Sequence, residues 1–179
     1  IAIGDPVTIS TDHEFFFGYG SDGGGGGRTY TAKWNFGQKP FKFSPPDGYQ
    51  SLNNASLPRT TAIDLVLDQD YNSSATYSGK TTATTPSGNG SVRANDGMGK
   101  GKWYAECLWN SGTVGSVIGI VQGLHSSSNN LGQGSYGYGY YSGGTFQNNG
   151  GDTGSPASYS RGDVIGVAYD GDNGTLTLY

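Results

Sequence analysis

Glycine makes up 33 of the 179 residues and separates short stretches in which apolar and polar residues alternate. Inside a helix each glycine costs about 0.5–1 kcal/mol relative to alanine, so a chain with this much glycine is poorly suited to long helices. Its 13 tyrosines and seven phenylalanines belong to the residue types enriched in strands. We therefore predict an all-β fold, an antiparallel β-sandwich of many short strands joined by turns.

Six segments carry a strand pattern, with apolar residues at every second position or in short runs bounded by turn residues. They are Glu14–Tyr19, Thr29–Phe36, Ala62–Asp68, Lys102–Trp109, Val164–Asp170 and Thr175–Tyr179. The single cysteine, Cys107, shares a strand face with both neighbouring tryptophans, so we predict a small core residue rather than a reactive thiol. The expected core residues are Trp103, Cys107, Ile118, Ile120, Val164 and Val167.

The last two of these segments are separated by a turn sequence that ends in Asn173-Gly174. Asn-Gly favours the left-handed backbone of a two-residue hairpin turn, and we expect Asp170 and Asp172 to accept hydrogen bonds from the turn amides. The same run has the oxygen density of a calcium loop but lacks its distal glutamate, so no metal is predicted there.

Several function classes are disfavoured by composition. A formal net charge of −4, without a basic cluster, does not fit a nucleic-acid partner. No apolar stretch approaches the length of a membrane span, so membrane insertion is not expected. His13 and His125 stand in unrelated polar contexts, without the spacing of a metal site or a nucleophile elbow. Glu106 is expected on a solvated strand face, and we predict no catalytic residue, no cofactor and no enzymatic activity.

Three segments carry distinctive motifs: Gly90–Gly112 with its GKWYAE strand, Ser135–Gly151 with YGYY before an NNG turn, and Tyr159–Tyr179 with GDVIGVAYDGDNGTLTLY. In their order and spacing these segments resemble the SPRY domain. The segment Trp34–Pro58, with NFGQKPF, resembles the ending that follows SPRY-like domains in large bacteriophage virion proteins. This resemblance implies a concanavalin-like jelly roll.

In the SPRY family further strands follow the last hairpin, and their counterparts lie at the start of this chain. We therefore expect parts of two tandem units: residues 1–57 would be the closing strands of one unit, 58–65 a linker, and 66–179 the opening part of the next. In this interpretation Lys102–Trp109 and Val164–Tyr179 expose sheet edges, which another subunit would complete, so a homo-oligomer is expected. The alternative is a single permuted sandwich completed by the N-terminal strands.

The segment between Tyr136 and Asn149 is the candidate binding site. Tyr136, Tyr138 and Tyr140 share one strand face, Tyr141 lies on the other, and the amides Gln147, Asn148 and Asn149 follow in a turn. Tyrosine rings stack on sugars or protein partners at low entropic cost, and amides bind hydroxyl groups. The alternative is that these tyrosines form a core or an aromatic ladder.

Together these observations favour a structural or adhesion module of a bacteriophage virion protein: a tail fibre, a tail-associated protein or a capsid decoration, located on the extracellular particle. The expected partners are other virion proteins and a host-surface glycan or receptor. A lectin-like carbohydrate-binding module and an accessory domain of a phage depolymerase are the alternatives.

Overall fold

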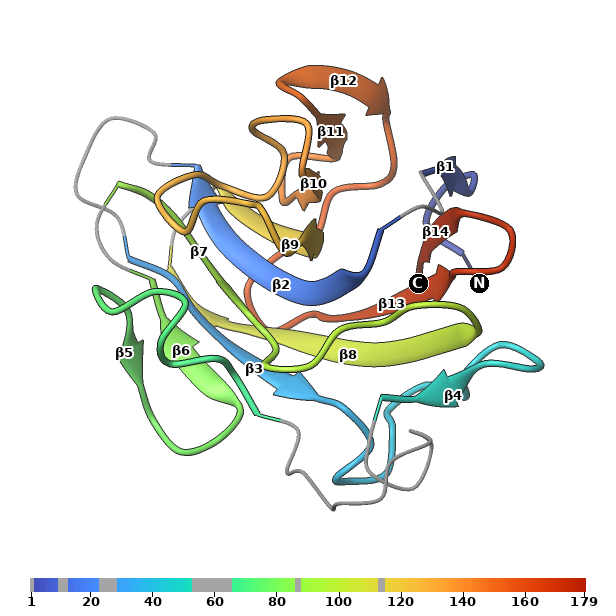
Figure 1. Ribbon diagram of the computed structural model, residues 1–179, viewed down its shortest axis with the longest axis horizontal. Coiled ribbons are helices and arrows are strands. Elements are labelled where there is room, and N and C mark those ends of the chain that lie inside the picture. Colours follow the sequence, from blue (N-terminus) through green and yellow to red (C-terminus); the bar gives the residue numbers. More distant parts are fainter. Residues whose placement is uncertain (1, 10–12, 23–28, 53–65, 86–87, 113–114) are drawn as a thin grey trace.

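The computed structural model describes residues 2–9, 13–22, 29–52, 66–85, 88–112 and 115–179 (Figure 1). Within these ranges the chain forms strands and turns and no helix, and the strands build two sheets that pack face to face. The prediction of an all-β antiparallel sandwich is confirmed. No helix that could cross a membrane is found in the described part of the chain.

One sheet has eight strands. Its order is β1 (Val7–Thr8), β14 (Thr175–Leu178), β13 (Val164–Asp170), β8 (Lys102–Ser111), β3 (Thr31–Asn35), β6 (Thr82–Thr84) and β5 (Thr76–Tyr77), with β4 (Gln50–Ser51) pairing in parallel with β8. The other sheet has six strands in the order β12 (Gly151–Gly154), β11 (Thr145–Asn148), β10 (Gly137–Tyr141), β9 (Ser116–Gln122), β2 (Phe15–Asp22) and β7 (Asn89–Arg93).

Strands from both ends of the chain share these sheets. In the six-stranded sheet β2 lies between β9 and β7, and in the eight-stranded sheet β3 lies between β8 and β6. The N-terminal β1 pairs with the C-terminal β14 (Figure 1). Strands of the expected 1–57 and 66–179 units are thus intermixed within the same sheets. The expected linker 58–65 lies outside the described residues. The β8 and β14 edges expected to be open are paired, β8 with β13 and β3, and β14 with β1.

The core between the sheets is aromatic. The Phe15 ring of β2 lies 5.5 Å from the Tyr169 ring of β13, edge to face, and the Phe17 ring lies 5.7 Å from the Trp34 ring of β3. Each such side chain contributes roughly 1.5–3 kcal/mol by leaving water. The N-terminal strand β2 is therefore held by core contacts as well as by its backbone pairing.

Five of the six expected core residues are buried in this core: Trp103, Cys107, Ile118, Ile120 and Val167. Burial raises the pKa of the Cys107 thiol well above its ordinary value, which fits its core role. Val164 is only partly buried, and the prediction for it was wrong. The alternation in β13 turns Ile165, Val167 and Tyr169 inward and Val164 to the outer face.

Five of the six predicted strands match β2, β3, β8, β13 and β14. The sixth, Ala62–Asp68, lies partly outside the described residues, and its described part, Val66–Asp68, forms no strand. Leu67 makes only an isolated bridge with Ala94, although its side chain is buried. An apolar run that fills a core position does not need a partner strand.

The β13–β14 hairpin differs from the predicted two-residue turn. Asp170 pairs with Thr175, so four residues close the hairpin. Asp170 Oδ1 accepts the N–H groups of Asp172 at 3.1 Å and Asn173 at 3.0 Å, as expected. The Asp172 carboxylate instead accepts the N–H of Gly101 at 3.0 Å. This bond connects the turn to the residue that directly precedes β8.

Candidate functional site

The tyrosines of β10 point to opposite sides of the six-stranded sheet. Tyr140 is fully buried in the aromatic core, its ring 4.7 Å from that of Tyr159, and its hydroxyl donates to the carbonyl of Ala157. Tyr138 packs on the same core, with its ring 5.9 Å from that of Phe15. Tyr140 is therefore closed to a ligand, and Tyr138 is engaged in core packing. For these two tyrosines the structure agrees with the alternative prediction, in which the tyrosines belong to the core.

Tyr136 is exposed, with 42% of its surface accessible, but it precedes the first residue of β10. Tyr141 is the last residue of that strand. At about 3.3 Å per residue the two tyrosines are separated by roughly 17 Å along the strand. The structure does not bring them into one site.

The amides of the predicted site have separate roles. Asn148 Nδ2 donates to the carbonyl of Gly137 at 2.8 Å, which fastens β11 to β10. Asn149 has a φ of 54° and Gly150 a φ of 72°, and together they form the two-residue loop between β11 and β12. The predicted NNG turn is therefore present, and it has the left-handed two-residue form that was expected at Asn173-Gly174. Gln147 and Asn148, which were expected in this turn, belong to β11. Asn148 and Asn149 are explained by the hairpin itself.

Tyr141 and Gln147 remain together on the outer face of the six-stranded sheet. They line a cleft of about 260 Å³ whose full lining is Asp22, Gly115, Tyr141, Ser142, Gly143, Thr145 and Gln147. We call it the tyrosine cleft. It combines one aromatic ring with a carboxylate, an amide and two hydroxyl groups, while its glycines leave the backbone accessible.

The cleft walls are fixed by hydrogen bonds. The Tyr141 hydroxyl donates to Asn130 Oδ1 at 2.7 Å, and Gln147 Nε2 donates to Asp152 Oδ1 at 2.8 Å. Burial raises the pKa of Tyr141, and the nearby charge of Asp22 adds to this, so the phenol stays protonated at neutral pH. At Gly115, where φ is 106°, a Cβ would overlap with the Asp22 carboxylate. The positive φ favours glycine at this position, and the missing Cβ leaves room for the Asp22 carboxylate.

A loop covers the rest of this outer face. Gly18, Gly119 and Gly139 lie side by side across β2, β9 and β10, and they leave a smooth surface. The loop over residues 123–136 packs on it through Leu131, which is fully buried against Val117 and Val121. The sequence signal for this arrangement was the glycine at every second position of β10, opposite the tyrosines.

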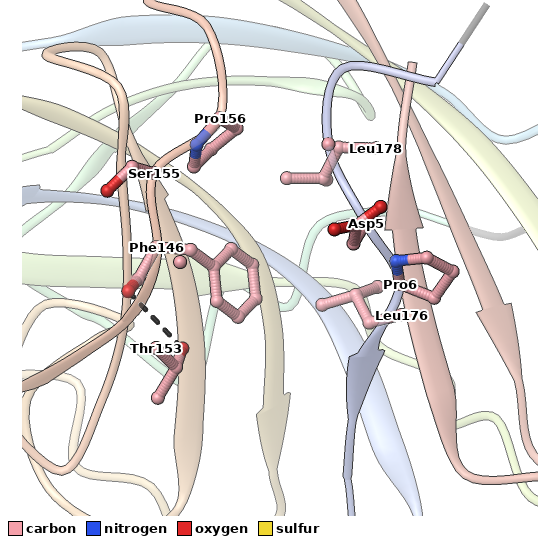
Figure 2. Close-up of a pocket in the computed structure, with 10 residues that line it drawn as sticks. Asp5, Pro6, Phe146, Thr153, Ser155, Pro156, Leu176 and Leu178 are labelled. Carbon is pink, nitrogen blue, oxygen red and sulfur yellow. Dashed lines mark hydrogen bonds between the residues drawn. The ribbon is translucent and has the colours of Figure 1, made fainter.

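A second cleft opens between the edges of the two sheets, and we call it the edge cleft (Figure 2). Its volume is about 320 Å³, and it is lined by Gly4, Asp5, Pro6, Phe146, Thr153, Gly154, Ser155, Pro156, Leu176 and Leu178. Figure 2 shows Phe146 and Thr153 on one wall and Leu176, Pro6 and Asp5 on the other. None of these residues was singled out from the sequence, because they come from chain segments far apart.

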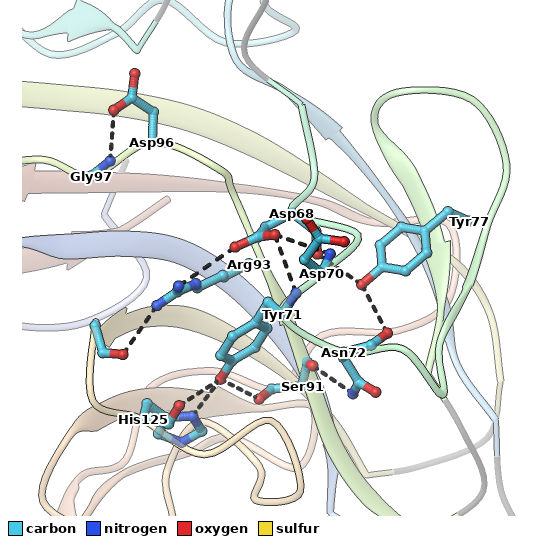
Figure 3. A network of polar contacts seen from close by, with 11 residues as sticks. Asp68, Asp70, Tyr71, Asn72, Tyr77, Ser91, Arg93, Asp96, Gly97 and His125 are labelled. Atoms are coloured by element: carbon cyan, nitrogen blue, oxygen red, sulfur yellow. Dashed lines mark hydrogen bonds and ion pairs between the residues drawn. The ribbon is translucent and has the colours of Figure 1, made fainter.

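Arg93, the last residue of β7, is the centre of a polar network (Figure 3). Its guanidinium carbon lies 4.3 Å from the ring centre of Phe16 and 4.4 Å from that of Tyr71, and its Nη2 lies 3.5 Å from Asp68 Oδ2. This cation–π sandwich holds the segment around Asp68 against the six-stranded sheet.

His125 belongs to the same network (Figure 3). Its Nε2 lies 2.9 Å from the Asn130 carbonyl, which can only accept, so Nε2 carries the proton and Nδ1 accepts from the Tyr71 hydroxyl at 2.8 Å. Burial lowers the pKa of His125, although the bond to Asn130 opposes this shift. Both ring nitrogens are therefore committed to structural bonds.

Glu106 is buried, contrary to the expectation of a solvated face. Its carboxylate accepts the backbone N–H groups of Lys42 at 2.9 Å and Phe43 at 2.8 Å. It thus fastens the segment after β3 onto the outer face of the eight-stranded sheet. Among the residues that the structure describes, no group of three or more His, Cys, Asp or Glu side chains is arranged to hold a metal ion.

Comparisons with protein-family models, curated proteins and solved structures found no match to this chain.

Proposed function

We propose that this chain is a recognition module of a bacteriophage virion protein and that it binds a host-surface glycan in the tyrosine cleft. The observation that carries the proposal is the meeting of Tyr141 and Gln147 with Asp22, Ser142 and Thr145 around one open cleft. Sugar rings offer flat C–H faces and many hydroxyl groups, so an aromatic ring beside carboxylate, amide and hydroxyl groups suits them.

The fixed walls of the cleft support this proposal. Because Tyr141 is already hydrogen-bonded to Asn130 and Gln147 to Asp152, little side-chain entropy remains to be lost when a ligand binds. An open cleft of about 260 Å³ suits one or two sugar units of a longer chain rather than an enclosed small molecule.

A role without catalysis is part of the proposal. His125 has both ring nitrogens in structural hydrogen bonds, and the Glu106 carboxylate is used by two backbone amides. The virion assignment rests on the resemblance of the chain to SPRY-like domains of phage particles. A rigid sandwich would suit a spacer or a recognition domain on such a particle.

The test is binding of the purified chain to an array of bacterial surface polysaccharides. We expect Tyr141→Ala to weaken binding to the recognised polysaccharide by about 5- to 150-fold, equivalent to about 1–3 kcal/mol. Gln147→Ala should weaken it less, since a single amide contributes about 0.5–1.5 kcal/mol. Tyr136→Ala is the matched control: it removes an exposed tyrosine outside the cleft and should leave binding unchanged.

Two results would count against the proposal. If Tyr141→Ala bound the polysaccharide as tightly as the unmodified chain, the tyrosine cleft would not be the binding site. Release of reducing sugar ends from the bound polysaccharide would favour an enzyme instead. The virion assignment has its own test, because an antiserum against the chain should label intact particles of a phage whose genome encodes it.

A further inference from the structure

The edge cleft lies where the sandwich is open along one side. Its floor is apolar: Phe146 is 2% exposed, and Leu176 and Leu178 are 1% and 6% exposed. Pro6 and Pro156 stand at the sides, and the Thr153 hydroxyl, which donates to the Phe146 carbonyl at 3.3 Å, lies at the rim. Apolar side chains that enter this cleft would therefore be removed from water against the end of the core.

Strand β12 runs beside this cleft and is the last strand of its sheet. It pairs with β11 on one side, and no strand in the described part of the chain pairs with its other side. Gly151, Asp152 and Thr153 are exposed. A strand edge with free backbone groups accepts another extended segment, whose alternate side chains then face the same way as those of the sheet.

The charge at the cleft is negative. Asp5 is exposed at the rim, and Asp152 projects from the edge strand itself. The whole chain carries a formal net charge of −4. Lysine or arginine in an approaching segment would be attracted by these carboxylates, whereas a second copy of this chain would bring Asp152 and Asp5 toward like charges.

We propose that the edge cleft binds an extended basic peptide of a partner protein, which adds a strand to β12. Every second side chain of the peptide is apolar and enters the cleft over Phe146, Leu176 and Leu178. The residues between them face away from the cleft, and a basic one lies near Asp152, while Asp5 at the cleft rim adds to the attraction of a basic peptide. The apolar floor of this site is separate from the tyrosine cleft, since Phe146 faces the core and Thr145 and Gln147 face outward. Asp152 is linked to both sites, because it accepts the hydrogen bond of Gln147 at 2.8 Å.

The probe is a fluorescent heptapeptide of alternating lysine and valine, Lys-Val-Lys-Val-Lys-Val-Lys, titrated with the intact chain in an anisotropy measurement. In a strand the N–H groups of alternate residues point to the same edge, so N-methylation of the three valines and N-methylation of the inner lysines remove different sets of bonds. We expect one of these two methylated peptides to lose binding by about tenfold or more and the other to retain it. The same peptide with glutamate in place of lysine should not bind.

Four variants of the chain locate the peptide. Ser155→Trp fills the edge cleft and should weaken binding by about tenfold or more, and Asp5→Lys should weaken it by several-fold, most strongly at low salt. Ser128→Trp places the same ring on an exposed loop and is the matched control, with no change expected. Tyr141→Ala should also leave peptide binding unchanged, so failure here is distinguishable from failure of the glycan proposal.

The proposal is overturned if both methylated peptides bind like the parent, because strand pairing would then be excluded. It is also overturned if Ser155→Trp binds the peptide as tightly as Ser128→Trp does. Attraction of the peptide to an acidic surface, without entry into the cleft, would then explain the binding. A dimer of the chain in sedimentation velocity that Ser155→Trp abolishes would show that a second copy occupies the cleft instead.

Discussion

The hydroxyl of Tyr141 donates a hydrogen bond of 2.7 Å to Asn130 Oδ1, so the loop that covers the outer face of the six-stranded sheet also sets the ring of the tyrosine cleft. Asn130 does more than accept this bond. Its side-chain oxygen also accepts the N–H groups of Gly132 at 3.1 Å and Gln133 at 3.0 Å, which shapes the loop around Leu131. The binding surface and the loop fold therefore depend on one amide.

Asn130→Ala should lower the free energy of unfolding by about 1–3 kcal/mol, because three donors lose their acceptor in a buried site. Tyr141→Phe removes only the phenol hydroxyl and should cost about 1 kcal/mol or less. Urea unfolding of both variants measures this difference. A cost for Asn130→Ala no larger than that for Tyr141→Phe would show that the loop does not depend on Asn130.

Gly119→Ala should destabilise the six-stranded sheet by about 1–3 kcal/mol or more, because an added Cβ would overlap with the backbone oxygen of Tyr138. Gly99→Ala is the control, since no atom lies within 4 Å of the added carbon there, and it should change stability by less than about 0.5 kcal/mol. Thermal unfolding of the two variants separates them. Equal melting temperatures would contradict the close packing of β9 and β10.

Stability should fall as the pH is lowered through the range in which His125 titrates. Burial lowers the pKa of folded His125 below its ordinary value of 6.5, so the unfolded chain binds the proton first. The stabilising contribution is complete above pH 6.5 and is lost as the pH falls from there through the folded pKa. Urea unfolding at about pH 7.5 and about pH 5 measures the loss.

His125→Gln is the control for that pH dependence, because glutamine can still donate to the Asn130 carbonyl but does not titrate. The variant should lose less stability between the two pH values than the unmodified chain. The same loss in both chains would assign the pH dependence to other groups.

The strand order also predicts how fragments behave. A chain of residues 66–179 alone lacks β2 and β3, which lie inside the two sheets, so it should not unfold cooperatively and should bind a hydrophobic dye. The intact chain should show one cooperative transition. A cooperatively unfolding 66–179 fragment would instead support the division into tandem units.

Much of the sandwich could be predicted because strands such as β8 and β13 are short apolar and aromatic runs bounded by turn residues, as strands buried on both faces are. In β10 the alternation of glycine and tyrosine showed that Tyr138 and Tyr140 share a face, but it could not show which face meets the core. That choice depends on Gly137 and Gly139, whose face is covered by the loop over residues 123–136. The alternation within a strand contains no information about which of its faces the preceding loop will cover.

The candidate site was predicted only in part for the same reason. Tyr141 and Gln147 were found because they lie in one tyrosine- and amide-rich segment. Asp22 comes from the end of β2, more than a hundred residues earlier in the chain, and reaches the cleft through the pairing of β2 with β9 and of β9 with β10. The edge cleft could not be predicted for a similar reason, since residues near both ends of the chain line it together with residues 146–156.

The central claim is that the tyrosine cleft binds a glycan, and its most direct measurement is the affinity of Tyr141→Ala for the recognised polysaccharide beside its thermal stability. The account predicts a loss of about 5- to 150-fold in affinity, while the exposed-tyrosine control Tyr136→Ala binds as before and Tyr141→Ala remains folded at the assay temperature. Unchanged affinity of folded Tyr141→Ala, or an equal loss in Tyr136→Ala, would contradict it.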